Sequence, residues 1–197
     1  MGHLTLLLGC MFAQKTTELV RRIRRYKSIG YSVLVVNHSS DTRYGEANQI
    51  ISHDRVLEHA VAAENLKDVD AAVRSGQYRV VAIDEGQFFG DLFQHVTQWA
   101  DTLPIHIVVA GLDGTSDRTP FGDLLRLIPH AEEVDRLSAF CAICKDGTVG
   151  NFSQFVGVQG HKQEDVVVGG AELYRPVCRA HFLEHSFQES TAISSSA

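Results

Sequence analysis

LLLGCMFAQKTTEL, residues 6–19, joins an apolar run to a segment with helical periodicity. Gly9 ends the run, and Gln14, Lys15 and Thr16 follow after four further residues. This layout nearly matches the phosphate-binding loop G-x-x-x-x-G-K-[ST]. In that loop, backbone N–H groups surround the β-phosphate, the lysine reaches the β/γ oxygens and the hydroxyl holds Mg²⁺. The stretch therefore predicts a strand, a phosphate loop and a helix in succession.

Gln14 stands where the phosphate-loop pattern has its second glycine. Glycine is favoured there because the loop needs a positive φ or a close approach of the phosphate to the Cα. A glutamine held in left-handed geometry costs roughly 1–3 kcal/mol. The alternative interpretation of this stretch is an ordinary buried strand followed by an amphipathic helix. The rest of the chain has to decide between this interpretation and a phosphate loop.

Length and charge exclude several classes of protein. The chain has 197 residues, which suits one domain of ordinary size with a small appendage, and its net charge is −6. Nucleic-acid binding is therefore not expected as the main function, and the basic cluster at residues 21–25 is interpreted as the solvated face of a helix. No apolar run approaches the ~20 residues that span a membrane. We expect a cytoplasmic protein whose cysteines are reduced or bound to metal.

Alternating strand and helix patterns predict the fold class. Apolar runs predict strands at residues 4–8, 32–37, 79–83 and 105–110, and helical periodicity predicts helices at 16–29, 69–75 and 92–100. Residues 51–63 fit either a short strand or a helix after a turn. The pattern predicts an α/β fold with a parallel sheet flanked by helices on both faces, like that of P-loop NTPases. Ligand contacts are then expected at the carboxyl ends of the strands.

The chain changes character after about residue 139. Short β-like pieces at residues 148–158 and 165–168 are separated by glycines, and the last residues include a run of serines. We therefore predict an α/β phosphate-loop domain at residues 1–139, a small metal-binding lobe at 140–183 and a disordered tail at 184–197.

Asp84 and Glu85 follow an apolar run directly, as acidic residues do where a phosphate-loop protein holds Mg²⁺. Because neighbouring side chains of a strand point to opposite faces, Asp84 can serve the metal while Glu85 points into the adjoining cleft. Glu85 can then accept a proton from an attacking hydroxyl. The alternative is a pair of solvated carboxylates at a strand end.

Two knuckles predict a zinc site. Cys141 and Cys144 form a C-x-x-C pair, and Cys178 and His181 form a C-x-x-H pair. Together they supply a closed tetrahedral Cys₃His set, which makes the role of Zn²⁺ structural. The alternatives are unrelated reduced cysteines, or His185 in place of His181 as the fourth ligand.

At this point the sequence resembles one family, the type II, zinc-containing thymidine kinases. The resemblance runs from about residue 3 to 182. It is carried by segments in the family's order and spacing: residues 9–19, 41–44, 53–55, 84–89, 112–115, 120–122, 168–170, Tyr174 and 177–179.

The resemblance implies a kinase that transfers the γ-phosphoryl group of ATP to the 5′-hydroxyl of thymidine or a related deoxynucleoside, with Glu85 as general base. It implies Mg²⁺ with ATP, structural Zn²⁺, no nucleic-acid or membrane partner, and a homo-oligomer, commonly a tetramer. The implied ATP and Mg²⁺ residues are Gly9, Cys10, Met11, Phe12, Ala13, Gln14, Lys15, Thr16, Asp41, Thr42, Arg43, Asp84 and Gln87. The implied nucleoside residues are Phe88, Ser116, Phe121, Asp165, Val166, Val167, Val168, Gly169 and Tyr174, several of them in a lasso loop of the zinc lobe.

The chain departs from the family pattern at three places. Gln14 replaces the loop glycine, Cys10 stands where proline is usual, and Ser116 and Asp117 stand where an aromatic residue and glutamine are usual. That aromatic residue stacks on the base, a contact worth about 1–3 kcal/mol. Ser116 therefore implies weaker nucleoside binding or a different base. The alternative hypothesis is a catalytically impaired relative that acts as a binding or oligomer subunit.

Overall fold

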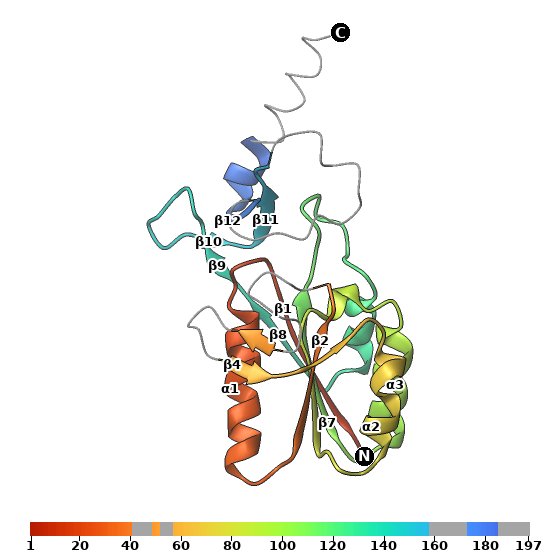
Figure 1. Cartoon of the computed structure of the whole chain (residues 1–197). Helices are drawn as coiled ribbons and strands as arrows, with labels where there is room; N and C mark the ends of the chain where they lie inside the picture. Colours follow the sequence, from red (N-terminus) through yellow and green to blue (C-terminus); the bar gives the residue numbers. More distant parts are fainter. Residues whose placement is uncertain (41–48, 52–56, 158–172, 185–197) are drawn as a thin grey trace.

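The computed structural model describes residues 1–40, 49–51, 57–157 and 173–184. Figure 1 shows a body of sheet and helices that carries a smaller β-rich lobe at one end. Within the described ranges, no helix combines the length and the apolar character that crossing a bilayer requires.

A parallel six-stranded sheet forms the centre of the body. Its strands lie in the order β5-β2-β6-β7-β1-β8, and each neighbouring pair is parallel. The strands are β1 (His3–Gly9), β2 (Val33–His38), β5 (Val61–Ala63), β6 (Val80–Ile83), β7 (His106–Leu112) and β8 (Glu133–Leu137). The register places Leu6 beside Val109 and Gly9 beside Leu112, so the ends of β1 and β7 coincide.

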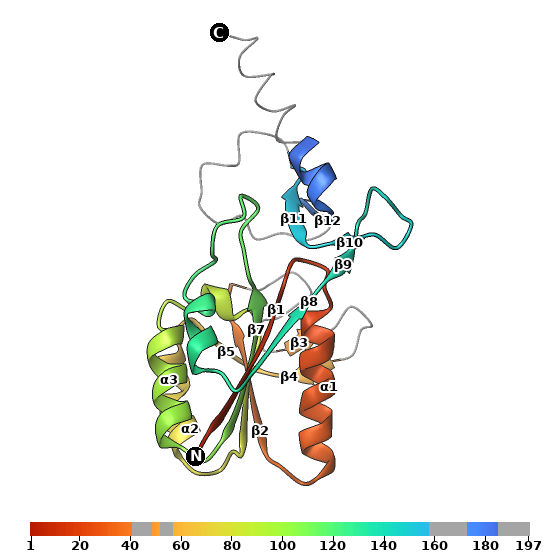
Figure 2. The ribbon, with the colours of Figure 1, turned by 180° about the vertical axis from the view of Figure 1, so that it is seen from behind.

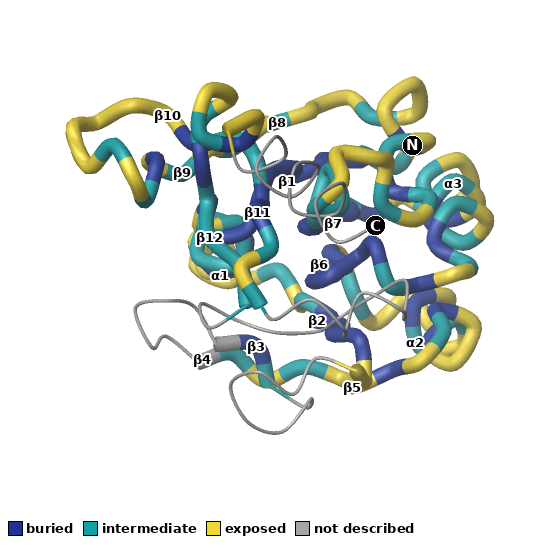
Figure 3. Tube along the Cα trace, turned by 90° about the horizontal axis from the view of Figure 1, so that it is seen from above, coloured by how far each residue is buried: buried dark blue, intermediate teal, exposed yellow. Residues whose placement is uncertain are grey.

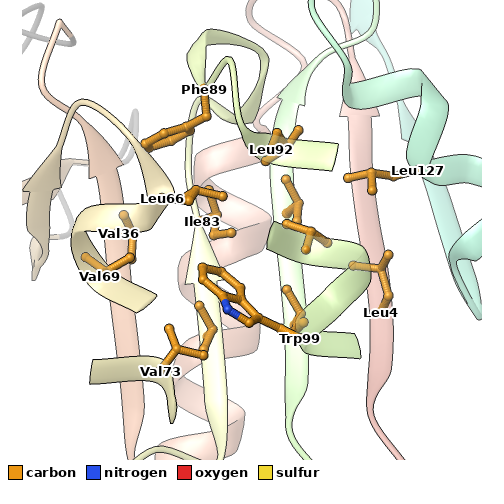
Figure 4. Close-up of a cluster of buried hydrophobic side chains, with 14 of the residues drawn as sticks. Leu4, Val36, Leu66, Val69, Val73, Ile83, Phe89, Leu92, Trp99 and Leu127 are labelled. Carbon is orange, nitrogen blue, oxygen red and sulfur yellow. The ribbon is translucent and has the colours of Figure 1, made fainter. Parts of the chain in front are cut away.

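Side chains alternate between two cores, one on each face of the sheet. Leu6 and Leu8 of β1 join the larger core with Trp99, whereas Leu7 joins the smaller core with Leu19 and Ile23. Figure 4 shows the larger core, in which Trp99 lies among side chains from the sheet and from the covering helices. Because both faces of the strands are buried, their sequences are continuously apolar.

Helices cover both faces, as Figures 1 and 2 show. The helix α1 (Lys15–Ser28) buries Leu19, Val20 and Ile23 against one face. The opposite face is covered by α2 (Asp70–Arg74), α3 (Leu92–Thr102) and the 3₁₀ segments η1 (Leu66–Val69) and η3 (Leu124–His130). Trp99 is fully buried, and its indole N–H donates to Asp70 Oδ1 at 2.7 Å, which ties α3 to α2.

The predicted α/β fold with a parallel sheet and helices on both faces is confirmed. The four predicted strands and three predicted helices are present, with ends shifted by a few residues. The ambiguous residues 51–63 contain strands: β3 (Gln49–Ile51) pairs antiparallel with β4 (Leu57–His59), and β5 joins the main sheet. β8 was not predicted, because its sequence EVDRL has three charged residues and no apolar run, as suits an edge strand in which no residue is buried.

The smaller lobe consists of two antiparallel pairs. β9 (Ala139–Phe140) pairs with β10 (Val149–Gly150), and β11 (Phe152–Phe155) pairs with β12 (Tyr174–Val177). A short helical segment follows at residues 179–184. Among its described residues the lobe has one small buried cluster, formed by Cys141, Val177 and Phe182. The division of the chain at residue 140 stays a prediction, and residues 185–197 lie outside the described ranges.

His106, at the amino end of β7, lies beside His3 in a setting that disfavours its charged form. The rings of His3 and His106 lie 5.6 Å apart, and the Nδ1 atoms of both are buried without a hydrogen-bond partner. Burial, followed by the charges of His3 and Arg79, lowers the pKa of His106. In the unfolded chain this imidazole titrates near its ordinary pKa of about 6.5.

We therefore expect stability to fall as the pH drops from about 7.5 to 5.5, because the unfolded state binds the proton more readily than the folded state does. His106→Gln should reduce this fall, whereas His59→Gln, which alters an exposed side chain, should not. Urea unfolding at both pH values measures the effect. Equal pH dependence in the original protein and the His106 variant would contradict it.

Candidate active site and metal centre

The predicted phosphate loop lies between β1 and α1, at the carboxyl edge of the sheet. Gln14 has φ 61° and ψ 31°, and Phe12 has φ 65°, so two non-glycine residues of this loop have left-handed backbones. The expectation that a glutamine occupies a left-handed position is confirmed. The Lys15 ammonium donates to the Cys10 carbonyl oxygen at 2.8 Å, across the mouth of the loop.

Gly9 is required at the start of the loop. Its φ is 150°, and a Cβ at this position would lie 2.3 Å from the carbonyl oxygen of Leu137. A contact this short with backbone atoms of β8 has no room to relax. Any larger residue would therefore push β8 away from β1 at the point where the loop leaves the sheet.

Thr16 and Asp84, the two residues predicted to serve magnesium, contact each other. The Thr16 hydroxyl donates to Asp84 Oδ2 at 2.9 Å, and Asp84 is only 3% exposed. The other oxygen, Oδ1, accepts the backbone N–H of Glu85 at 3.0 Å. A hydroxyl and a buried carboxylate side by side are the ligand types that hard divalent cations prefer.

The backbone conformation of Glu85, and not the predicted strand alternation, sets its orientation relative to Asp84. β6 ends at Ile83, so strand alternation does not orient Asp84 and Glu85, and that argument was wrong. Glu85 instead has a left-handed backbone, with φ 52° and ψ 41°, and is only 7% exposed. A strained conformation at a buried carboxylate is typical of a functional position.

Gln87 holds Glu85 in place. Its side-chain amide donates to Glu85 Oε2, and its Oε1 accepts the backbone N–H of Leu112 at 2.9 Å. Gly122 makes room for this arrangement, because a Cβ there would lie 2.4 Å from the Gln87 carbonyl oxygen. Gln87 therefore connects the segment after β6 to the end of β7.

Two predicted nucleoside residues, Phe88 and Phe121, meet in the structure although they are far apart in the sequence. The rings of Phe88 and Phe121 pack edge to face, with centroids 5.5 Å apart. His38, at the end of β2, contacts the same group, with its ring 5.6 Å from that of Phe88. The structure thus joins aromatic residues from three segments at the carboxyl edge of the sheet, and sequence reasoning missed His38.

Ser116 and Tyr174 lie in parts of the chain that approach each other. Ser116 belongs to the loop after β7, and Tyr174 begins β12 and packs edge to face with Phe155 at 5.4 Å. Burial, followed by the charge of Asp117, raises the pKa of Tyr174. The Asp117 carboxylate is therefore close enough to Tyr174 to disfavour the phenolate.

Several predicted site residues lie outside the described ranges. They are Asp41, Thr42, Arg43, Asp165, Val166, Val167, Val168 and Gly169. Their roles remain predictions from the resemblance.

The predicted metal ligands come together in the smaller lobe. The ligand atoms of Cys141, Cys144, Cys178 and His181 all lie within 4.8 Å of one another. His181 Nδ1 is 3.5, 3.4 and 3.3 Å from the three sulfurs in chain order, and the sulfurs of Cys144 and Cys178 are 3.9 Å apart. Tetrahedral zinc, with bonds of about 2.3 Å to S and 2.0 Å to N, spaces its ligands by about 3.5 to 3.8 Å. The cluster fits Zn²⁺.

The acidities of the thiols also favour a cation at this cluster. Burial opposes ionisation of Cys141, but backbone N–H groups of Cys144, Cys178 and Ile143 hold its pKa at about 6. Burial and the neighbouring cysteines raise the pKa of Cys144 to about 11. One thiolate therefore disfavours the next, and a bound cation removes this conflict.

The phosphate loop also contacts the zinc lobe, defined here as residues 139–157 and 173–184, and sequence reasoning missed this contact. The Met11 backbone N–H donates to the Ser153 hydroxyl at 3.0 Å, and the Cys10 thiol donates to the Gly150 carbonyl oxygen at 3.2 Å. Figure 3 views this end of the molecule, with β11 and β12 near β1 and α1. No sequence signal marks Ser153, because about 140 residues separate it from the loop.

Gln14→Gly should stabilise the protein by about 1 kcal/mol, because glycine adopts the left-handed backbone without a Cβ penalty. Denaturant unfolding measures the change. The matched control is Ala13→Gly: Ala13 is buried and has no positive φ, so its loss should destabilise the protein. An unchanged or lower stability of the Gln14 variant would show that the loop is not strained there.

The purified protein should contain about one zinc per chain, and Cys144→Ser should reduce the zinc content well below that value. Cys10→Ser is the matched control, because Cys10 is buried but lies outside the Cys₃His cluster. Metal analysis by mass spectrometry measures both. Equal zinc contents in the two variants would rule out the assigned ligands.

Comparisons with known proteins agree with this geometry. A family model described as thymidine kinase matches residues 2–182. The chain is 39% identical over 178 residues to the thymidine kinase of rabbit fibroma virus (strain Kasza), covering 90% of this chain and 94% of the relative. It is 40% identical over 179 residues to that of myxoma virus (strain Uriarra), covering 90% and 94%. It is 38% identical over 184 residues to that of vaccinia virus (strain Western Reserve), covering 93% and 98%. The chain belongs to the thymidine kinase family.

Proposed function

We propose that this protein is a deoxynucleoside kinase that transfers the γ-phosphoryl group of ATP to the 5′-hydroxyl of thymidine, for nucleotide salvage. The observation that carries the proposal is the buried constellation at the carboxyl edge of the sheet. There the Thr16 hydroxyl donates a hydrogen bond to Asp84. The next residue, Glu85, accepts a hydrogen bond from the Gln87 side-chain amide. Phosphoryl transfer depends mainly on positioning and electrostatics, which such a rigid, charged edge supplies.

The phosphate loop and Lys15 would bind the phosphates of ATP. Backbone N–H groups in the first turn of α1 would contribute, because the helix dipole favours negative charge at this end of the helix. Lys15 exchanges its contact with the Cys10 carbonyl for the β/γ oxygens. Thr16 and Asp84 would hold Mg²⁺, which neutralises charge on the phosphates when bound. Arg43 would add positive charge on the phosphoryl group.

Glu85 would act as the general base that accepts the proton of the nucleoside hydroxyl. The hydrogen bond from the Gln87 side-chain amide to Oε2 fixes the position of this carboxylate. Fixing the carboxylate matters because a base has to lie within hydrogen-bond reach of the proton that it removes.

The nucleoside would bind between the aromatic residues after β6 and the zinc lobe. Phe88 and Phe121 provide an apolar wall, and Tyr174 with residues 165–169 would complete the pocket. Ser116, in place of an aromatic residue, removes one stacking contact, so we propose a higher KM for thymidine than an aromatic residue would give.

The remaining assignments concern the metal and the assembly. We propose that Zn²⁺ in the Cys₃His cluster is structural, because four protein ligands leave no open position for substrate. It would stabilise a lobe whose own buried cluster is small. A homo-oligomer, in the form of a tetramer, and a cytoplasmic location are proposed from the family resemblance.

We expect Mg²⁺ and ATP-dependent phosphorylation of thymidine, and Glu85→Gln should reduce kcat at least about 100-fold with little change in ATP binding. The control is Glu64→Gln, which alters an exposed carboxylate. A radiolabel transfer assay over a panel of deoxynucleosides measures both the activity and the base preference. If the original protein binds MgATP but phosphorylates no member of the panel, the proposed activity is wrong.

A further inference from the structure

The loop that follows β7 reaches across to the zinc lobe through Arg118. The centre of its guanidinium lies 4.5 Å from the Phe182 ring centroid and 5.7 Å from that of Phe152. Phe182 is 8% exposed and belongs to the buried cluster of the lobe. Arg118 has a left-handed backbone, with φ 62°, so its loop is bent sharply at the point of contact.

Arg118 packs on the same part of the zinc lobe that contacts the phosphate loop. Phe152 directly precedes Ser153, whose hydroxyl accepts the Met11 N–H, and Gly150 accepts the Cys10 thiol. Cys10, Ser153, Phe152 and Arg118 also line one cavity of about 140 Å³ between the loop and the lobe. Two contacts are therefore adjacent parts of one interface: the one between Arg118 and Phe152, and the one between Ser153 and Met11.

The phosphate loop needs restraint from outside because it lacks the glycine that would relieve its strain. Phe12 and Gln14 both have positive φ, and such conformations persist only where surrounding contacts impose them. The hydrogen bonds from Met11 and Cys10 to the lobe are contacts of this kind. Their geometry depends on where the lobe sits.

We propose that Arg118 is a positioning residue, which seats the zinc lobe on the phosphate loop and so keeps the loop backbone in the form that binds MgATP. The proposal rests on the kinase function proposed above. In this role Arg118 contacts neither ATP nor the nucleoside, and it acts through Phe152 and Phe182.

Arg179 provides a matched control within the same aromatic group. Its guanidinium lies 5.0 Å from the centroid of the Phe152 ring, but it comes from the lobe itself. Removing Arg179 therefore removes a cation–π contact with Phe152 but no contact between the lobe and the loop that follows β7. Arg118→Gln therefore removes contacts between the loop after β7 and the lobe, whereas Arg179→Gln removes a contact within the lobe.

The first experiment is amide hydrogen exchange on the zinc-loaded full-length chain, which reports on the loop whether or not ATP binds. Arg118→Gln should speed exchange of the amides of residues 10–13 about three- to tenfold, as expected for loss of exposed cation–π contacts. Arg118→Lys should restore part of the protection, and Arg179→Gln should leave it unchanged. Equal exchange in the Arg118→Gln and Arg179→Gln variants would overturn the proposal.

The second experiment is a double-mutant cycle on MgATP binding, measured by calorimetry. Arg118→Gln and Ser153→Ala should each raise the Kd about three- to tenfold, and the double variant should raise it little further. Effects that simply multiply would overturn the proposal, because they would mean that Arg118 does not act through Ser153. If the original protein does not bind MgATP, the kinase proposal fails, and the exchange experiment alone decides the role of Arg118.

Discussion

The parallel pairing of β6, β7 and β1 is the constraint on which the site depends. It brings the carboxyl ends of three strands to one edge, where Gly9 lies beside Leu112 and Ile83, which directly precedes Asp84, lies beside Val109. The hydrogen bond from Thr16 to Asp84 then joins the phosphate loop to the acidic segment. Buried apolar faces on both sides of the sheet hold this edge rigid, so the carboxylates keep their positions without support from solvent.

Strain is concentrated at the same edge. Phe12, Gln14 and Glu85 all have left-handed backbones although none is glycine. Each such residue costs of order 1–3 kcal/mol, and the surrounding contacts have to outweigh that cost. At Glu85 the hydrogen bonds to Asp84 and Gln87 do so. At the phosphate loop the contacts come from Gly150 and Ser153 of the zinc lobe. The lobe thus supports the loop of the proposed nucleotide site as well as carrying the Cys₃His cluster.

The charged groups near α1 differ along the length of the helix. Its first turn faces the proposed phosphate site, whereas the basic residues farther along pair with carboxylates: Arg22 bonds Glu18, Glu133 and Asp135, and Lys27 bonds Glu58. The hydrogen bond from Arg21, with further donors from Arg22, lowers the pKa of Glu18 to about 2. Arg22 is only 13% exposed, so it ties α1 to the edge strand β8. Arg21, Arg24 and Arg25 are exposed, as their interpretation as a solvated helix face predicts, whereas the largely covered Arg22 serves the fold.

The sequence by itself determined the sheet-and-helix order, the loop between β1 and α1, the acidic pair and the members of the Cys₃His cluster, because each depends on local periodicity or on short spacings. It missed β8, whose edge position weakens the apolar pattern, and it misjudged how Glu85 is oriented, because a left-handed residue outside a strand leaves no periodic signal. Only the tertiary structure decided that His38 joins Phe88, that Ser153 bonds Met11 and that Arg118 packs on Phe182. These contacts join segments far apart in the chain, and their geometry follows from how the sheet and the lobe pack rather than from any local pattern of residues.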